Sequence, residues 1–353
     1  MLLCGPETGE RLLAHYRKAM PYVLGTYILL VAAGFVFLNL RLTVEWVAII
    51  LFVAAVLSGR AMLFLRDWGV FIVVLLAWQL TSPLATRFSF PWHLKELIDA
   101  DKLLFFGRVP PVWLQQHLYQ PGRVRWWDVM AACFYLLHFL APLAAGFALW
   151  MVNRPLFRKY MVTYIVVFLA GFATYVLYPA VPPWMAAQPL VAVGHEYLFP
   201  WVAAKQGYPG GLHAAWQHSH VYLPHVQNLF GIIMKNWYNP YNGTIFFGFL
   251  HLSYDQVAAV PSEHAAYPLL FFLFLRRQFG KWSYPSLIYI GGLLFAITYL
   301  GQHYVIDAII GFAYAGIGYA LVMHAWPAVM RLRESREPEV SPRSLARPEL
   351  EEA

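Results

Sequence analysis

Residues 261–268 of the chain read PSEHAAYP, and residues 301–307 read GQHYVID. Each stretch stands at the start of an apolar run, and each carries ionisable side chains where a bilayer normally excludes them. Burying a histidine or an aspartate in hydrocarbon is costly, so such residues are functional candidates by default. We therefore expect both stretches to begin on the same side of a membrane and to form one phosphate-handling site.

The composition places the chain in a membrane. Of its 353 residues, 60% are hydrophobic and only 12% are charged, whereas a soluble domain carries about 25% charged residues. The net charge of +7 is therefore no sign of nucleic-acid binding, because in a membrane protein the positions of the charges matter more than their sum. The two cysteines fall in a polar tail (Cys4) and in an apolar run (Cys133), so we expect neither a disulfide nor a cysteine-based metal site.

The fold class predicted is an all-α polytopic bundle of about eight transmembrane helices, with a six-helix catalytic core. The apolar runs lie near 20–40, 43–59, 68–86, 128–151, 160–178, 264–275, 284–300 and 304–326. We interpret the first run as a retained anchor rather than a cleaved signal peptide. The sixth run is short, so we expect its helix to start near Val257 and to hold Pro261 in its first turn.

The basic residues predict the orientation. With the N-terminus inside, 16 of the 25 Lys and Arg residues fall on the inner side, as the positive-inside rule requires. Both motifs then begin at the outer face, and Arg66 and Asp67 form an interfacial pair at the inner edge. This predicts a bacterial inner-membrane protein with a periplasmic site, or a protein of the Golgi or endoplasmic reticulum with a lumenal site.

Three domains are expected. Residues 1–60 would hold a cytoplasmic N-terminus and two peripheral spans, residues 61–330 the catalytic core, and residues 331–353 a disordered cytoplasmic tail. Within the core, the charged and aromatic segment 87–127 predicts amphipathic helices lying in the membrane interface. The outer loop 179–258 is long enough to be functional.

Ser262 and His264 suit the start of a helix that binds an anion. Ser262 follows a proline and precedes an apolar run, so it is a candidate N-cap whose hydroxyl can donate to a phosphate. His264 lies in the same first turn and can reach an ester oxygen. The neighbouring Glu263 would favour a protonated His264, which suits a general acid. The plain alternative is a capping serine beside an interfacial histidine.

His303 and Asp307 are four residues apart, so they share one helix face. A carboxylate bonded to one ring nitrogen fixes the tautomer and leaves the other nitrogen as nucleophile or base. In this reading His303 attacks phosphorus, Asp307 holds the imidazolium, and His264 protonates the leaving oxygen and later deprotonates the acceptor. No metal and no other cofactor is required. The alternative is a buried structural ion pair.

Both stretches resemble motifs of the type 2 phosphatidic acid phosphatase (PAP2) superfamily. The spacings Ser262-x-His264-x3-Pro268 and His303-Tyr304-x2-Asp307 resemble its second and third motifs, over roughly the last six spans. Further likenesses are to the inositol phosphorylceramide synthase branch, in the PSxHxxxP phrase, in the phrase TYLGQHYVID at 298–307, in the proline-rich turn at 178–183 and in the segment at 103–107. The resemblance implies a membrane enzyme that moves a phosphoryl group or phosphorylated headgroup between lipids.

The chain departs from the simple lipid phosphatases at two positions. Their Lys-x6-Arg-Pro motif has no outer-side counterpart here, since Arg154-Pro155 falls on the inner side with Phe147 at the lysine position. Ile297 stands where an arginine precedes the third-motif histidine. These departures favour the transferase branch and leave the cation for the phosphate open. The substrate-binding candidates are Ser262, Tyr304, Lys205, Lys235 and Arg108, with Lys102 as a further outer cation.

Other sites were weighed against the phosphate site. A zinc site at His213, His218, His220 and His225 lacks nearby cysteine and carboxylate partners. Four histidines fall within predicted spans, namely His138, His264, His303 and His324. Ligation of a haem iron by two of them fits the sequence less well than phosphate chemistry does.

Three functions were weighed for the chain as a whole. The first is transfer of a phosphorylated headgroup, such as phosphoinositol, from a phospholipid to a lipid alcohol through a phosphohistidine. The second is a lipid phosphate or polyprenyl pyrophosphate phosphatase with water as acceptor. The third is a non-enzymatic transporter or scaffold. The partners expected are lipid substrates and the membrane, with no nucleic acid, and the oligomeric state stays open.

Overall fold

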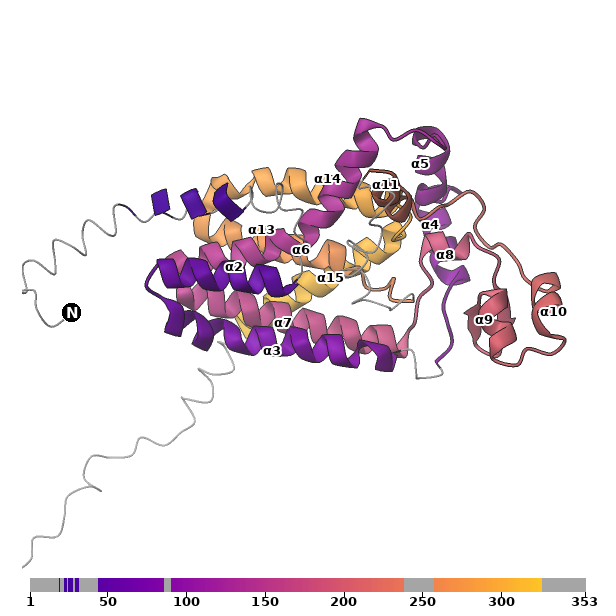
Figure 1. Ribbon diagram of the computed structural model, residues 1–353, viewed down its shortest axis with the longest axis horizontal. Helices are drawn as coiled ribbons and strands as arrows, with labels where there is room; N and C mark the ends of the chain where they lie inside the picture. Colours follow the sequence, from indigo (N-terminus) through magenta and orange to yellow (C-terminus); the bar gives the residue numbers. More distant parts are fainter. Residues whose placement is uncertain are drawn as a thin grey trace, which may run out of the picture.

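The computed structural model describes residues 44–85, 90–237 and 257–325, together with a few residues between 19 and 31. The described chain is mostly helical, and long helices run side by side in one bundle (Figure 1). Most of the expected first span and the whole expected C-terminal tail, 331–353, lie outside the described residues.

The long helices follow the predicted apolar runs closely. They are α2 (Val44–Leu57), α3 (Ala61–Ala85), α6 (Trp126–Val152), α7 (Arg154–Leu177), α13 (Glu263–Phe279), α14 (Pro285–Tyr299) and α15 (Val305–Ala320), with the 3-10 turn η1 (Gly280–Ser283) and the π-helical turn η2 (Leu321–Ala325). Two segments, Arg154–Leu177 and Val305–Ala325, are long and apolar enough to cross a membrane, and the bent helix α6 would be a third. The described residues therefore belong to a helical membrane protein.

Short elements gather at one end of the bundle, on the right of Figure 1. They are α4 (Lys95–Leu104), α5 (Pro110–Leu118), α8 (Pro183–Ala186), the antiparallel hairpin of β1 (Val191–Val193) and β2 (Glu196–Leu198), α9 (Pro200–Lys205), α10 (Gly211–Gln217) and α11 (Leu229–Trp237). Helix α4 is amphipathic, with Leu97 and Ile98 buried and Leu103 exposed. The elements at this end belong to the two long segments between predicted spans, 87–127 and 179–258.

The prediction that the sixth helix starts near Val257 is wrong. Helix α13 begins at Glu263, and residues 257–262 before it form a turn, a β-bridge and a bend. Ala180 donates to the carbonyl of Val257 at 2.6 Å and accepts from the amide of Ala259 at 3.2 Å. These residues satisfy their backbone groups through strand-like pairing, and Pro261 has no N–H to offer a helix.

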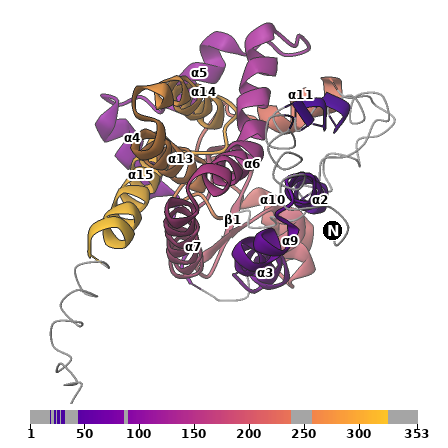
Figure 2. The ribbon, with the colours of Figure 1, turned by 90° about the vertical axis from the view of Figure 1, so that its left-hand side faces the viewer.

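Helix α13 lies at the centre of the bundle and packs against α6, α7, α14 and α15 (Figure 2). Its closest approach is to α15. A Cβ on Gly311 would stand 2.2 Å from the carbonyl oxygen of Ser262, so only glycine allows the two helices to come this near. The amide of Ser262 also donates to the carbonyl of Asp307 at 3.0 Å. The starts of α13 and α15 are thereby fixed against each other.

Candidate functional site

The two sequence motifs meet at the starts of α13 and α15. His264 Nδ1 lies 3.1 Å from His303 Nε2, although the residues are 39 positions apart. His303 is 5% exposed and Asp307 is fully buried. Three of the predicted site residues thus converge at one place, which we call the histidine end of the bundle.

The turn before α15 sets the position of His303. Gly301 has a φ of 76°, a conformation that suits glycine, and a Cβ there would stand 2.8 Å from the carbonyl oxygen of Gln227. The amides of Gln302 and His303 then both donate to the carbonyl of Ile297. This tight turn ends α14 and directs His303 toward α13.

The surroundings of His303 fix its tautomer. Its Nδ1 lies 3.0 Å from the carbonyl oxygen of Ala259 and 3.4 Å from Asp307 Oδ2. Because a carbonyl oxygen can only accept, Nδ1 carries the hydrogen, and Nε2 of the neutral ring keeps its lone pair. His264 Nδ1 must then donate to that lone pair. Nε2 is therefore the ring nitrogen that carries the lone pair, and the imidazole of His264 faces it.

Asp307 has a second contact besides the ring of His303. Its Oδ2 accepts from the amide of Tyr304 at 2.9 Å, which caps the start of α15. The backbone carbonyl of Ala259 is nearer to the ring than the carboxylate is. Two acceptors therefore orient His303, of which only Asp307 was predicted from the sequence.

Ser262 occupies the predicted N-cap position of α13, but its hydroxyl does not cap the helix. The side chain is fully buried, and Oγ has no hydrogen-bond partner among the described residues. An unsatisfied buried hydroxyl is costly and calls for an explanation. A phosphate oxygen bound next to His264 would supply the missing partner. The side chain of Glu263, by contrast, extends toward α7, and its Oε1 would lie 2.7 Å from a Cβ added to Gly171.

Asp101 is a site residue that sequence reasoning missed. It lies in α4, is fully buried, and accepts from the amides of Val305 at 3.2 Å and Ile306 at 3.0 Å. Burial raises the pKa of Asp101 to about 6, from an ordinary value of 3.8. The carboxylate occupies the N-terminal amides of α15, so those two amides are not available to another anion.

His138 is a second missed residue. Its ring in α6 lies 4.2 Å from the ring of His264, centroid to centroid, and Tyr135 stacks on His264 at 4.8 Å. The two residues are one helical turn apart, so α6 presents both rings to His264. The signal in the sequence was a histidine inside an apolar run, which had been considered only as a haem ligand.

The predicted cations are spread over the histidine-end segments. Lys205 is exposed at the end of α9, and α9 packs on α10 and β1 rather than on α13. Lys235 falls in α11, but its side chain lies outside the described residues. Arg108 is exposed and lines a groove near the start of α15. Lys102 pairs with Asp99 at 3.6 Å.

Tyr304 is buried in the apolar cluster between the bundle and the outer segments. Within the described chain no three His, Cys, Asp or Glu residues lie close enough to hold a metal, the loop histidines included.

Comparison with known proteins gives the family of the chain. The family model described as PAP2 superfamily matches residues 95–321, from the start of α4 to the end of α15. The chain belongs to the PAP2 superfamily. The matched residues include both motif stretches, 261–268 and 301–307.

A curated relative of this PAP2 protein is the phosphoinositol dihydroceramide synthase of Bacteroides thetaiotaomicron. The two are 27% identical over 195 residues, which is 54% of each chain. The chain thus matches about half the length of that relative. No solved structure matches the chain.

Proposed function

We propose that the chain transfers a phosphorylated headgroup, such as phosphoinositol, from a phospholipid donor to a lipid alcohol. The observation that carries the proposal is the pair of facing imidazoles, with Nε2 of His303 3.1 Å from Nδ1 of His264 and Nδ1 of His303 held by Ala259 and Asp307. One ring supplies a lone pair for attack once His264 moves aside, and the other supplies an N–H for the leaving group.

In the first step the donor phosphate enters between the two rings, and His264 turns aside to admit it. Nε2 of His303 attacks phosphorus, the N–P bond forms, and the P–O bond to the diacylglycerol breaks. His264, protonated on both ring nitrogens, gives its Nδ1 proton to the leaving oxygen and becomes neutral. The positive charge on His303 is stabilised by Asp307 and by the carbonyl of Ala259, while the hydroxyl of Ser262 donates to a phosphate oxygen.

In the second step the hydroxyl of the acceptor lipid gives its proton to His264. Its oxygen attacks phosphorus, the N–P bond breaks, and His303 returns to its neutral form. Water in place of the acceptor would give the alternative reaction, hydrolysis. Transfer is favoured because the Lys-x6-Arg-Pro motif of the simple phosphatases has no outer-side counterpart in this chain, and because Ile297 stands where an arginine precedes their third-motif histidine. The curated relative is also named a synthase.

A groove beside the site suits a lipid tail. It has a volume of about 730 Å³ and is lined mainly by apolar residues of α5, of α14 and of the loop between α4 and α5, among them Phe105, Trp113 and Phe295. Val305, two residues after His303, and Arg108 also line it. We place an acyl chain of the substrate in this groove, with Arg108 near the phosphate. Lys205, Lys235 and Tyr304 are weaker candidates for headgroup contact.

The proposal includes the membrane arrangement. The chain would cross the membrane about eight times, with residues 1–60 as an added N-terminal unit, residues 61–330 as a six-helix core, and residues 331–353 as a tail. The histidine end would face the outside or the lumen, because the arginine-rich connections lie at the other end. The family match covers α6, α7, α13, α14 and α15 of this core, and α3 lies before it.

The test is a transfer assay with the purified full chain. Phosphatidylinositol labelled in its inositol is supplied with dihydroceramide in mixed micelles, and the products are separated. We expect a labelled sphingolipid, and no product with His264→Ala or His303→Ala. His117→Ala, an exposed histidine of α5, is the control and keeps full activity. Release of soluble inositol phosphate alone would reject transfer, and full activity in either site variant would reject the site.

A further inference from the structure

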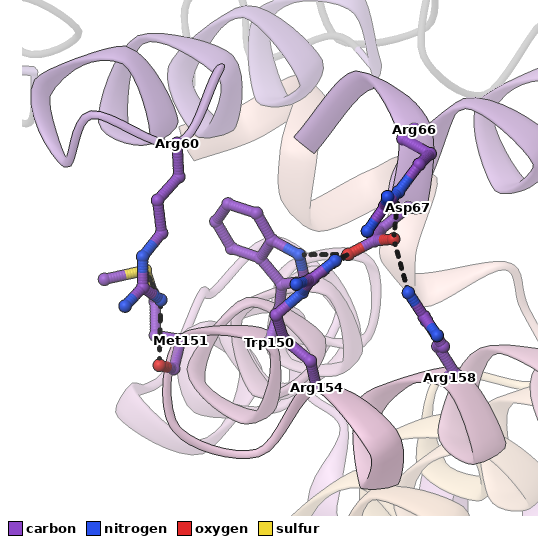
Figure 3. A network of polar contacts seen from close by, with 7 residues as sticks. All are labelled: Arg60, Arg66, Asp67, Trp150, Met151, Arg154 and Arg158. Carbon is purple, nitrogen blue, oxygen red and sulfur yellow. Dashed lines mark hydrogen bonds and ion pairs between the residues drawn. The ribbon is translucent and has the colours of Figure 1, made fainter. Parts of the chain in front are cut away.

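A second polar cluster lies between α3, α6 and α7, around the carboxylate of Asp67 (Figure 3). Arg154 bonds Asp67 Oδ2 at 2.8 Å through Nε, and the indole of Trp150 donates to the same oxygen at 3.0 Å. Arg158 and Arg66 reach Oδ1 at 3.3 Å and 3.4 Å. The sequence had indicated only the pair of Arg66 with Asp67.

The cluster carries more positive than negative charge. One carboxylate, 3% exposed, faces three guanidinium groups, of which Arg154 is 29% exposed. The side chains of Arg66 and Arg158 are 61% and 57% exposed. Asp67 can neutralise one of the three, so two outward-facing positive charges stay uncompensated within this cluster and favour an anion.

The same helix faces continue as exposed apolar stripes. On α3, Val70 and Val73 follow Arg66 by four and seven residues, and both are exposed. On α7, Val162, Val166 and Leu169 follow Arg158 by four, eight and eleven residues, and they too are exposed. These spacings keep each stripe on the face of its arginine. Helices α3 and α7 lie side by side in both views (Figures 1 and 2).

This cluster is separate from the histidine end. The start of α13 lies beside Gly171 of α7. Arg158 is 13 residues earlier on the same helix, which is about 20 Å along its axis. The cluster also stands at the end of the bundle that the positive-inside rule places in the cytoplasm, where membranes present anionic lipids.

We propose that Arg66 and Arg158 bind the phosphate of an anionic glycerophospholipid in the leaflet opposite the catalytic histidines. The headgroup lies between the two guanidinium groups, and the acyl chains follow the stripes of α3 and α7. A phospholipid is the occupant that matches both features, because charge and apolar surface adjoin on the same two helix faces. Asp67, which is itself held by Arg154 and Trp150, keeps the two arginines in place and stays out of contact with the lipid.

The test measures lipid binding to the purified full chain by native mass spectrometry, with palmitoyl-oleoyl phosphatidylglycerol and the matching phosphatidylcholine titrated in detergent. An arginine beside the headgroup of a bound anionic lipid adds roughly fivefold to its affinity, so the double variant Arg66→Gln/Arg158→Gln, which removes both arginines of the proposed site, should bind phosphatidylglycerol roughly 30-fold more weakly. The control Arg276→Gln/Arg277→Gln removes the same charge from two exposed arginines of α13 and keeps wild-type binding.

Equal binding of the two lipids by the wild type overturns the proposal, whatever the fate of the variants. Unchanged binding in the first double variant, or an equal loss in the control, does so too. If the native spectra show a dimer that binds no phosphatidylglycerol, and if phosphatidylglycerol does not dissociate that dimer, this face would instead be assigned to contact with a second copy of the chain.

Discussion

Replacing Asp307 by asparagine separates the two groups that orient His303. Asparagine keeps an oxygen that can accept from the amide of Tyr304, so the helix start is preserved. The change removes the negative charge 3.4 Å from Nδ1 of His303 but leaves the carbonyl of Ala259 at 3.0 Å. That carbonyl still holds the hydrogen on Nδ1, so the tautomer survives and only the charge stabilisation of the imidazolium is lost.

The size of the loss follows from the distance. At an effective dielectric constant of about 20, two unit charges this close interact by about 5 kcal/mol, and the hydrogen bond from the amide of Tyr304 to the carboxylate already offsets part of it. A loss of about 2 to 4 kcal/mol in the transition state lowers kcat roughly 30-fold to 1,000-fold. His303→Ala, which removes the nucleophile, should lower it further.

The assay is the transfer reaction under saturating donor and acceptor, with thermal unfolding as a check on folding. Asp128→Asn is the matched control, because Asp128 is also a buried carboxylate that caps the start of its own helix by accepting from Arg125 at 2.7 Å. It should lower stability and leave kcat within about threefold. The reasoning is refuted if Asp307→Asn keeps more than half the activity, or if it is as inactive as His303→Ala, since the carbonyl would then have no orienting role.

Three further predictions concern packing and pH. His138→Ala removes the ring that packs on His264 at 4.2 Å and should lower kcat about tenfold with KM changed less than twofold; an unchanged kcat contradicts this. Gly311→Ala places a methyl group 2.2 Å from a carbonyl of the neighbouring helix and should destabilise the fold by about 1–3 kcal/mol in denaturant unfolding, whereas Gly316→Ala, which meets open space, should not. Burial raises the pKa of Asp101 to about 6 from 3.8, so its protonated form favours the fold; the free energy of unfolding should fall as pH rises from about 4 to about 6, and the persistence of that slope in Asp101→Asn would contradict the assignment.

The part of the site that could be predicted from sequence is the part that is local along the chain. His303 and Asp307 share a helix face by their spacing, and the alternation of apolar runs brings the starts of α13 and α15 to one end. The limits of the long helices followed from the same runs, since hydropathy decides where a helix can enter a membrane. The number of membrane-spanning helices did not follow as firmly. Among the described residues, only two segments, or three if bent α6 is included, are long and apolar enough to cross a membrane.

The residues that sequence reasoning missed are those brought in by long-range packing. Asp101 caps α15 from 204 residues away, and nothing in its amphipathic surroundings marks it as different from the other charges of that segment. Ala259 acts through a backbone carbonyl, which leaves no trace in residue type. His138 was visible as a histidine in an apolar run, but its contact with the ring of His264 depends on how α6 packs against α13. Helix α13 began late because Val257 and Ala259 pair with Ala180, a contact across 77 or more residues.

The central claim is that phosphorus becomes bonded to Nε2 of His303 during turnover. Incubating the purified chain briefly with phosphatidylinositol labelled with ³²P in its phosphate, without acceptor, and then digesting it under alkaline conditions allows the labelled peptide to be located by mass spectrometry. The account predicts acid-labile label on His303, its absence in His303→Ala, and its discharge when dihydroceramide is added. Label on any other residue, or turnover with no labelled protein at any time after mixing, would contradict it.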